Sequence, residues 1–203
     1  MAGLMLNGSM IQGLVYNGNP VSAMYNGQLI WPLDTPTPGP SFSTVTIGNQ
    51  VWTDDDIKID DGLSGITKQV VYDQDGNSLG EKYFYTWDAA MRVASGIDGW
   101  HLPTYNEINT LNTNVSNISY IKSTSGWYSG ANGNNLYGFN LTPAGCLNGY
   151  GESYRNGFAA YFWTSNETRN VDAFQAFVYF EYTSIARPYD YKTNSLPVRL
   201  IKD

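Results

Sequence analysis

The stretch GWHLPTYNEINTLNTNV (residues 99–115) carries one of two helix signals in this chain. Pro103 and Thr104 open its helical part, and Glu107 follows Thr104 by three residues, which is the spacing of a capping box. The other signal is TWDAAMRVASG (residues 86–96), an alanine-rich run that ends in a glycine. We therefore predict two helices, one in each stretch.

Short strands and turns account for the rest of the pattern. STVTIGNQVW (43–52) predicts two strands around a Gly-Asn turn, and KQVVY (68–72) and KYFYTW (82–87) flank the turn sequence YDQDGNSLG (72–80). After residue 123 only Gly- and Asn-rich loops and short aromatic strands follow. Two helices within a β- and loop-rich body predict an α+β fold.

The composition limits the function classes. Of 203 residues, 14% are charged and 15% are aromatic, a balance typical of loop-rich extracellular proteins. The net charge is -7 and there is no basic run, so we expect no nucleic-acid partner and no anionic membrane surface. No apolar run is long enough to span a bilayer, and the N-terminal residues do not resemble a signal peptide. We therefore expect no membrane insertion; either the chain is not exported by that route, or a leader has been removed.

Three Asn-Gly pairs punctuate the N-terminal region, beginning at Asn7, Asn17 and Asn26. Asn-Gly suits a type I′ turn, so the pattern predicts tight β-hairpin repeats. Two-stranded hairpins of this kind are only marginally stable in water on their own. They form either an ordinary meander packed on this chain or an attachment module, which would also be the route to a homo-oligomer. The predicted organisation is a repeat module at 1–33, a Pro-rich linker at 34–41 and a main domain at 42–203.

Six separated blocks carry a family resemblance. In chain order they are TVTIGNQVW, YTWDAAM, GWHLPTYNEINTL, YGFNLTPAG, AYFWTSNE and LPVRLIKD. In order and approximate spacing they resemble the Fibrobacter succinogenes major paralogous (FISUMP) domain, over Thr44 to Asp203. The resemblance implies a C-type-lectin-like fold in which the terminal strands pair, two helices flank a small, mostly antiparallel sheet, and a loop-rich C-terminal half presents a ligand face.

The resemblance also points to a subgroup. Lectin-like domains of this type are similar to the variable proteins of diversity-generating retroelements, which bind receptors or ligands, several of them at phage tail tips. The segment from Gly151 to Lys192 occupies the place that is rewritten in those proteins. This implies a virion or an extracellular, cell-surface location.

Catalytic residues are not expected. His101 is the single histidine and lies inside GWHLPT, where a scaffold role is favoured. The GWHLPT block is also similar to formylglycine-generating enzymes, but their oxidation needs a reactive cysteine pair and Cys146 stands alone. We therefore expect a protein that is not an enzyme and needs no cofactor.

Calcium is the remaining candidate ligand ion. The acidic run from Asp54 to Asp61 is predicted to be a solvated loop, and DQDGN (73–77) is predicted to be a hairpin turn, because it lacks the full calcium-loop spacing. The sugar-site motifs of calcium-dependent lectins are missing, and WTSNE (163–167) is only loosely similar to one of them. We expect no metal, and a calcium-dependent carbohydrate lectin is the third reading of function.

The segment AFQAFVYFEYTSIARPYDYK (173–192) is unusually aromatic. Strand alternation assigns one face to the core, made of Phe174, Ala176, Val178, Phe180 and Tyr182. The other face is Gln175, Phe177, Tyr179, Glu181 and Thr183, and it is expected at the surface because burying its polar groups is costly. The alternative is that these rings cover one another or pack under the 123–140 loop.

The first interpretation is a non-enzymatic ligand- or receptor-binding protein whose partner is a protein or glycan on a cell surface. Phe162, Trp163 and Trp100 are expected to be scaffold. The alternative is a structural component of a virion or cell-surface layer. Tyr and Arg are enriched at binding hot spots. The candidate ligand-binding residues are Tyr154, Arg155, Asn156, Phe158, Gln175, Phe177, Tyr179, Glu181, Ile185, Arg187, Tyr189, Asp190 and Tyr191.

Overall fold

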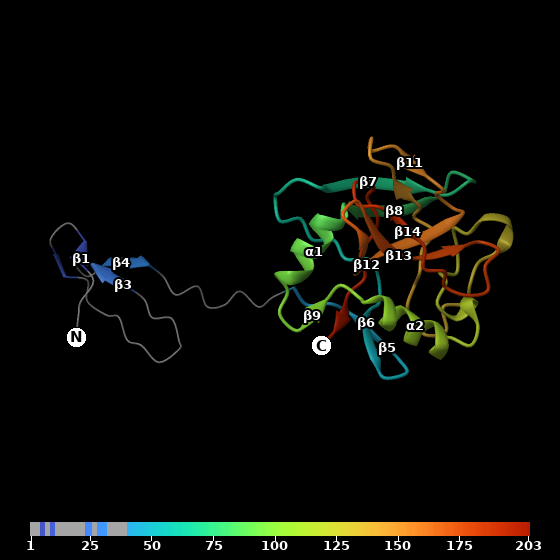
Figure 1. The fold of residues 1–203 in the computed structure, drawn as a ribbon, viewed down its shortest axis with the longest axis horizontal. Helices are drawn as coiled ribbons and strands as arrows, with labels where there is room; N and C mark the ends of the chain where they lie inside the picture. Colours follow the sequence, from blue (N-terminus) through green and yellow to red (C-terminus); the bar gives the residue numbers. More distant parts are fainter. Residues whose placement is uncertain (1–4, 7–8, 11–22, 26–27, 32–39) are drawn as a thin grey trace. The chain divides into compact units, whose positions relative to one another are not determined.

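The computed structural model describes residues 5–6, 9–10, 23–25, 28–31 and 40–203 (Figure 1). The chain divides into two compact units, 1–41 and 42–203. In the first, β1 (Met5–Leu6) pairs with β2 (Ser9–Met10), and β3 (Ala23–Tyr25) pairs with β4 (Gln28–Trp31), both antiparallel. The predicted repeat at Asn17 and residues 34–39 of the predicted linker lie outside the described residues, and the repeat module stays a prediction.

The second unit, called here the main unit, has two α-helices among short strands. Its elements are β5 (Thr44–Ile47), β6 (Gln50–Thr53), β7 (Ile66–Tyr72), β8 (Ser78–Tyr85), α1 (Trp87–Ser95), β9 (Trp100–His101), α2 (Tyr105–Asn114), the 3-10 turns η1 (Ile118–Tyr120) and η2 (Tyr128–Gly130), β10 (Cys146–Leu147), β11 (Ser153–Tyr154), β12 (Ala159–Arg169), β13 (Asp172–Tyr179), β14 (Tyr189–Tyr191) and β15 (Ile201–Lys202). The predicted α+β class is confirmed. None of the described helices is long and apolar enough to cross a membrane.

Several small sheets replace the single sheet that the resemblance implied. One has the order β5-β6-β15-β9, another β12-β13-β14, and β7-β8 and β10-β11 form separate ribbons. Ile201 of β15 pairs with Trp52 of β6 and with His101 of β9, so the first and last strands of the main unit share one sheet. The terminal strands share this sheet as expected, but β6 lies between β5 and β15, so they do not pair directly.

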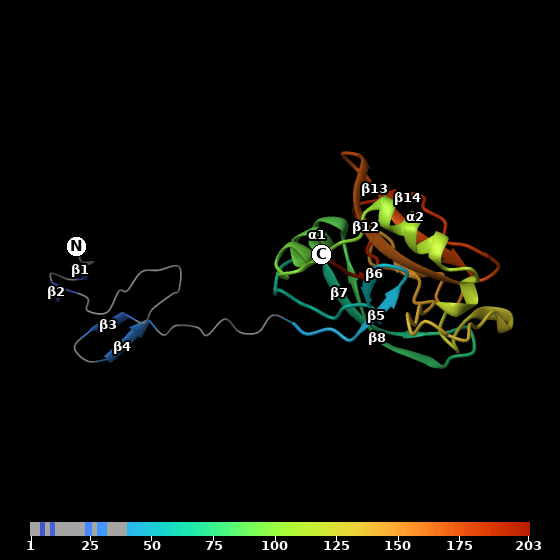
Figure 2. The same ribbon diagram turned by 90° about the horizontal axis from the view of Figure 1, so that it is seen from below.

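Both predicted helices begin and end where local signals place them. The Thr104 side chain accepts a hydrogen bond from the Glu107 backbone, while the Glu107 carboxylate accepts one from the Thr104 backbone at 2.7 Å. This reciprocal pair is the predicted capping box. Helix α1 starts after Thr86, whose hydroxyl accepts from Ala89, and it ends at Gly96. Figure 2 shows α2 lying across β12 and β13.

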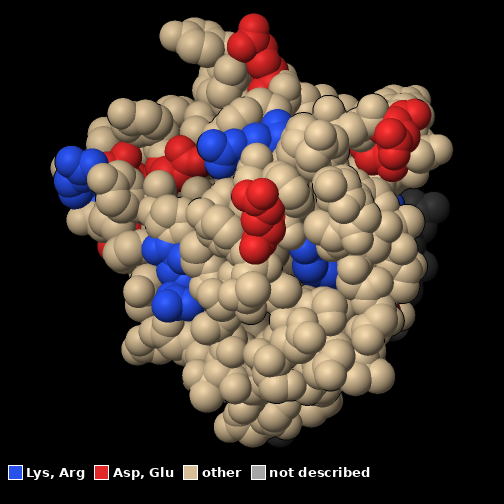
Figure 3. Space-filling model, turned by 90° about the vertical axis from the view of Figure 1, so that its right-hand side faces the viewer, with Lys and Arg blue, Asp and Glu red and all other residues tan. Residues whose placement is uncertain are grey.

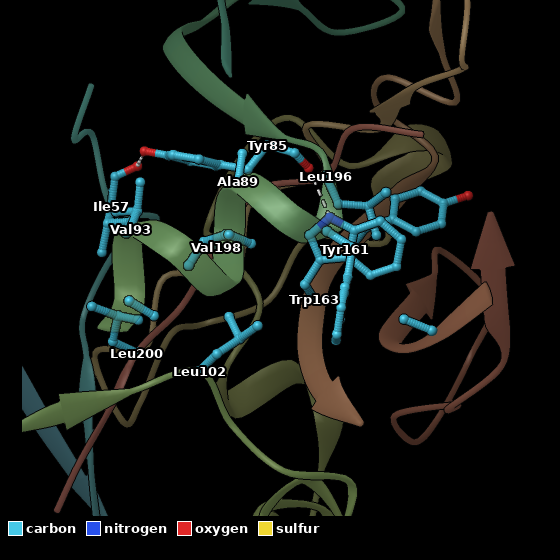
Figure 4. Close-up of a cluster of buried hydrophobic side chains, with 14 of the residues drawn as sticks. Ile57, Tyr85, Ala89, Val93, Leu102, Tyr161, Trp163, Leu196, Val198 and Leu200 are labelled. Carbon is cyan, nitrogen blue, oxygen red and sulfur yellow. Dashed lines mark hydrogen bonds between the residues drawn. The ribbon is translucent and has the colours of Figure 1, made fainter. Parts of the chain in front are cut away.

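The hairpin of β12 and β13 separates the two larger of the three hydrophobic core clusters among the described residues. The α1-side core contains buried residues of α1 together with Tyr161 and Trp163 of β12. The α2-side core contains residues of α2 together with Phe162 of β12 and Val178 of β13. Figure 4 shows the first cluster, in which the Trp163 indole donates to the carbonyl of Tyr85 at 2.7 Å. Phe162 and Trp163 are fully buried, as expected of scaffold residues.

Strand alternation predicted the wrong environment for Gln175 and Phe177, which were expected at the surface, whereas Glu181 and Thr183 are exposed as expected. Phe177 is 8% exposed and Gln175 is 4% exposed, both on the side of β13 that faces the α1-side core. Because β13 is the central strand of its sheet and is covered on both faces, alternation does not separate core from surface there. Strand β13 ends at Tyr179, so Tyr182, expected in the core, lies beyond it and is 42% exposed.

The acidic segment is not a uniformly solvated loop. Asp56 is buried and forms ion pairs with Lys82 and Arg199, which corrects the expectation at that position. The DQDGN segment joins β7 to β8 as predicted, and the Asp73 carboxylate accepts from the backbone of Asn77 at 2.8 Å. This side-chain bond is typical of Asp in a hairpin turn.

Candidate functional site: a surface of aromatic rings

Five aromatic rings meet near the C-terminal end of β13. The ring centroids of Tyr128 and Phe158 are 4.5 Å apart, those of Tyr179 and Phe180 are 4.7 Å apart, and those of Tyr179 and Tyr182 are 5.9 Å apart. Phe158 and Phe180 join the two ends of this series at 6.0 Å. With the adjoining Tyr154 and Arg155, these rings form what we call the aromatic face: Tyr128, Tyr154, Arg155, Phe158, Tyr179, Phe180 and Tyr182.

Backbone hydrogen bonds bring three distant segments to this place. Ala159 at the start of β12 pairs with Tyr179 at the end of β13, and the Phe180 amide donates to the Phe158 carbonyl at 2.8 Å. The Tyr128 amide donates to the Gly157 carbonyl, also at 2.8 Å. The rings are therefore mounted on a paired hairpin end and on a loop tied to it.

Arg155 sits at the centre of the aromatic face in a left-handed backbone conformation, with φ of 62°. Its carbonyl accepts hydrogen bonds from Phe158 and Ala159, each at 3.0 Å, which closes the turn into β12. Its guanidinium donates to the Tyr161 hydroxyl at 3.0 Å and lies 4.9 Å from the Tyr154 ring centroid. These contacts fix the guanidinium among the rings, as in cation–π pairs.

Tyr161 and Cys146, which lie beneath the aromatic face, are neutral near pH 7. Burial raises the pKa of the Tyr161 phenol and raises the pKa of the Cys146 thiol to about 12. A thiol with that pKa is almost wholly protonated at neutral pH and is a poor nucleophile. These groups therefore support the surface and do not supply an activated nucleophile.

Lys122 supports the aromatic face from below. Its ammonium donates to the Phe180 carbonyl at 3.1 Å and lies 3.9 Å from the Trp127 ring centroid, while only 3% of the residue is exposed. Burial lowers the pKa of Lys122 to about 8. The lysine thus anchors the chain after β13 to the loop that carries Tyr128.

The outer edge of the aromatic face is open to solvent. Tyr128 and Tyr154 are each 44% exposed and Tyr182 is 42% exposed, although all three have large apolar rings. Figure 3 shows the side of the main unit that carries these loops: Lys, Arg, Asp and Glu side chains lie across its upper and central part, and none is visible on its lower part. Rings offer large contact area with few rotatable bonds, so the arrangement suits recognition of another molecule.

Residues 45–202 match the family model described as the Fibrobacter succinogenes major domain. The chain belongs to that family. No curated protein and no solved structure matches the chain significantly. The match covers the span over which the sequence blocks predicted membership.

Within this Fibrobacter succinogenes major domain, the blocks that carry the resemblance are scaffold. They include the capping box of Thr104 and Glu107, the buried Trp163 and the buried Arg199. All seven residues of the aromatic face lie between the blocks, in segments 112–136, 146–159 and 168–195. The scaffold and the candidate surface therefore occupy separate parts of the sequence.

The sequence-predicted binding residues fall into two groups at opposite ends of β13. Tyr154, Arg155, Phe158 and Tyr179 belong to the aromatic face. The other end carries β14, whose Tyr189 pairs with Phe174 near the start of β13. The two groups are therefore separate surfaces.

The second group is the β14 edge, made of Arg187, Tyr189, Asp190 and Tyr191. Tyr189 is 58% exposed and Tyr191 is 63% exposed. Burial raises the pKa of Asp190, whose carboxylate accepts from Asn194 at 2.8 Å. The guanidinium of Arg187 lies 5.5 Å from the Tyr105 ring centroid. This edge is polar and tied down by its own contacts, so it is the weaker binding candidate.

Several predicted residues do not reach the surface. Phe177, Gln175 and Ile185 are buried, so they cannot contact a ligand directly and act only through their neighbours. Glu181 is exposed beside Tyr182. The Asn156 carbonyl accepts from Gln74 at 2.6 Å, which makes Asn156 part of the frame.

Sequence reasoning missed three members of the aromatic face. Phe180 and Tyr182 were assigned to the core because the strand was expected to continue beyond Tyr179, and Tyr128 was not singled out. The signal for Tyr128 was its position in GWYSG, an aromatic pair between two glycines in a loop. Among the described residues, no group of three His, Cys, Asp or Glu side chains is placed to hold a metal ion.

Proposed function

We propose that this chain is a non-enzymatic binding protein that holds a ligand or receptor against the aromatic face. The observation that carries the proposal is that three exposed tyrosines belong to one connected set of aromatic rings, which also includes Arg155. Exposed Tyr and Arg in contiguous contact are the residue types most enriched at interface hot spots. The partner is a protein or glycan on a cell surface, and the protein acts at a virion or cell exterior.

The finer part of the proposal concerns the scaffold. A C-type-lectin-like domain with a fixed core and a changeable face would account for the separation between the family blocks and the aromatic face. Under this proposal, retroelement-directed mutagenesis rewrites exposed codons such as those of Tyr154 and Tyr182. The test is to compare the 3′ end of the gene with neighbouring DNA. An adenine-rich template repeat whose adenines fall in exposed codons is expected, and absence of such a repeat contradicts this part.

The binding claim is tested with the variant Tyr154→Ser/Tyr182→Ser. Fluorescently labelled full chain is added to a panel of intact bacterial cells of different species, and bound protein is measured by flow cytometry. Wild type is expected to bind at least one strain, and the double variant to lose about tenfold or more, since each serine removes a hot-spot ring. The matched control is Tyr72→Ser/Tyr150→Ser, because these tyrosines are exposed outside the aromatic face. Equal loss in both variants, or no binding by wild type, contradicts the proposal.

A further inference from the structure

A cleft adjoins the aromatic face and shares one ring with it. Its volume is about 610 Å³, within the range of small-molecule sites. The turn at 73–79 forms one wall and the segment 125–132 forms the other. Tyr128 lines the cleft and also contacts Phe158, so the cleft and the aromatic face meet at this residue.

Hydrogen bonds fix the positions of the two walls of the cleft. Gln74 donates to the Asn156 carbonyl at 2.6 Å, which ties the 73–79 turn to the segment before β12. The Trp127 amide donates to the Asn132 side chain at 2.9 Å, which closes the other wall on itself. Gly126 has φ of 88°, and a Cβ there would lie 2.4 Å from the Leu79 side chain. The left-handed backbone favours glycine at this position, and an added side chain would have to displace the end of the Leu79 side chain on the opposite wall.

The chemistry of the lining favours one ligand class. None of the described residues that line the cleft is Lys, Arg or His, so nothing there would neutralise an anion. The Asp73 carboxylate already accepts from the Asp75 and Asn77 backbones at 2.9 and 2.8 Å, which leaves it less able to hold a cation. The amides of Asn77 and Asn132 and the neighbouring hydroxyls can both donate and accept. The hydroxyl groups of a ligand can likewise both donate and accept hydrogen bonds.

We propose that this cleft binds a neutral saccharide without a metal ion, its hydroxyls bonded to the amides and carboxylates and its C–H face against the ring of Tyr128. The inference rests on the proposed function, because it gives the binding protein one ligand class. Apart from Tyr128, the residues that line the cleft are not part of the aromatic face.

The test is a titration of the ¹⁵N-labelled full chain followed by amide chemical shifts. The probes are cellotetraose, mannotetraose and N-acetylated chitotetraose, with tetragalacturonate and spermidine as charged comparisons. At least one neutral tetrasaccharide is expected to give saturable shifts confined to 73–79 and 125–132, undiminished by a chelator. Asp75→Arg, in the exposed turn, should weaken this binding tenfold or more, and Asp98→Arg, exposed in another loop, should leave it unchanged.

Two results overturn the inference: no saturable shift in the cleft with any neutral probe, or equal shifts with spermidine. The variant Tyr154→Ser/Tyr182→Ser separates this failure from failure of the proposed function. If that variant loses cell binding while no saccharide enters the cleft, the binding function stands and the cleft inference fails. If saccharides bind the cleft and the variant keeps full cell binding, the aromatic face is not the receptor site and the cleft inference stands.

Discussion

The guanidinium Nε of Arg199 lies 2.7 Å from Oδ1 of Asp56, and both side chains are buried. Lys82 reaches the other carboxylate oxygen at 3.3 Å, and Arg199 also donates to the carbonyls of Thr53 and Phe139. This buried ionic cluster connects β6, β8, the residues just before β15 and the loop at 123–140. It fixes the frame on which the aromatic face is mounted.

Replacing Asp56 with Asn should destabilise the protein by about 3 kcal/mol at pH 7, because Lys82 and Arg199 would keep buried charges with only the half-exposed Asp55 carboxylate, at 3.3 and 3.7 Å, as an acidic partner. Burial alone raises the pKa of Asp56, but Lys82 and Arg199 outweigh it and hold the pKa below its ordinary value. The stabilisation is therefore complete above the unfolded pKa of about 4 and is lost as the pH falls through the folded pKa.

Denaturant unfolding at pH 7, 5 and 3 checks this prediction. The difference in the free energy of unfolding between wild type and Asp56→Asn should be smallest at pH 3. Asp54→Asn is the control, since Asp54 is only partly buried, and it should stay within about 0.5 kcal/mol of wild type. A gap that is the same at all three pH values would contradict the assignment.

Lys122→Met should stabilise the protein at pH 7 by about 1 kcal/mol. Burial lowers the folded pKa of Lys122 to about 8, so holding the charged form at pH 7 costs free energy of folding. Removing the charge relieves about 3 kcal/mol, whereas losing the bond to the Phe180 carbonyl and the cation–π contact with the Trp127 ring together costs about 2 kcal/mol. Between about pH 8 and the unfolded pKa the unfolded chain binds the extra proton, so wild type gains stability as pH rises.

The measurement is the free energy of unfolding at pH 7 and 9.5 for wild type and Lys122→Met. The advantage of the variant should shrink at the higher pH. Lys58→Met, at an exposed position, serves as the comparison and should show no such trend. An advantage that does not change with pH would mean that Lys122 is not the cause.

Phe177 and Tyr191 were equal binding candidates in the sequence, and the structure separates them. Phe177 is 8% exposed and its ring lies 4.9 Å from that of Tyr161, whereas Tyr191 is 63% exposed. Phe177→Ala should cost about 3 to 5 kcal/mol of stability, and Tyr191→Ala about 0.5 kcal/mol or less. Thermal and denaturant unfolding compare the two, and similar costs would contradict the burial pattern.

Local signals predicted local structure well. The capping box at Thr104, the stop at Gly96 and the turn at Gly48 depend on neighbours within a few residues, and each is found where it was expected. Family blocks predicted membership and a sheet that contains both terminal strands. These features needed no knowledge of the tertiary arrangement.

Features that depend on distant contacts could not be predicted. Alternation in β13 assumes one solvated face, but both faces are covered, so Phe177 was placed at the surface. The partner of Asp56 is Arg199, 143 residues away, and nothing in the acidic run reveals it. Tyr128 joins the aromatic face only because its loop bonds to Gly157.

The proposed function requires that the exposed rings of the aromatic face contribute little to folding. The free energy of unfolding of Tyr154→Ser/Tyr182→Ser measures that contribution, with Phe162→Ala as the reference for a ring that the fold requires. We expect a loss of about 1.5 kcal/mol or less for the double variant, against about 3 to 5 kcal/mol for Phe162→Ala. A loss in the double variant as large as that of Phe162→Ala would show that these rings serve the fold.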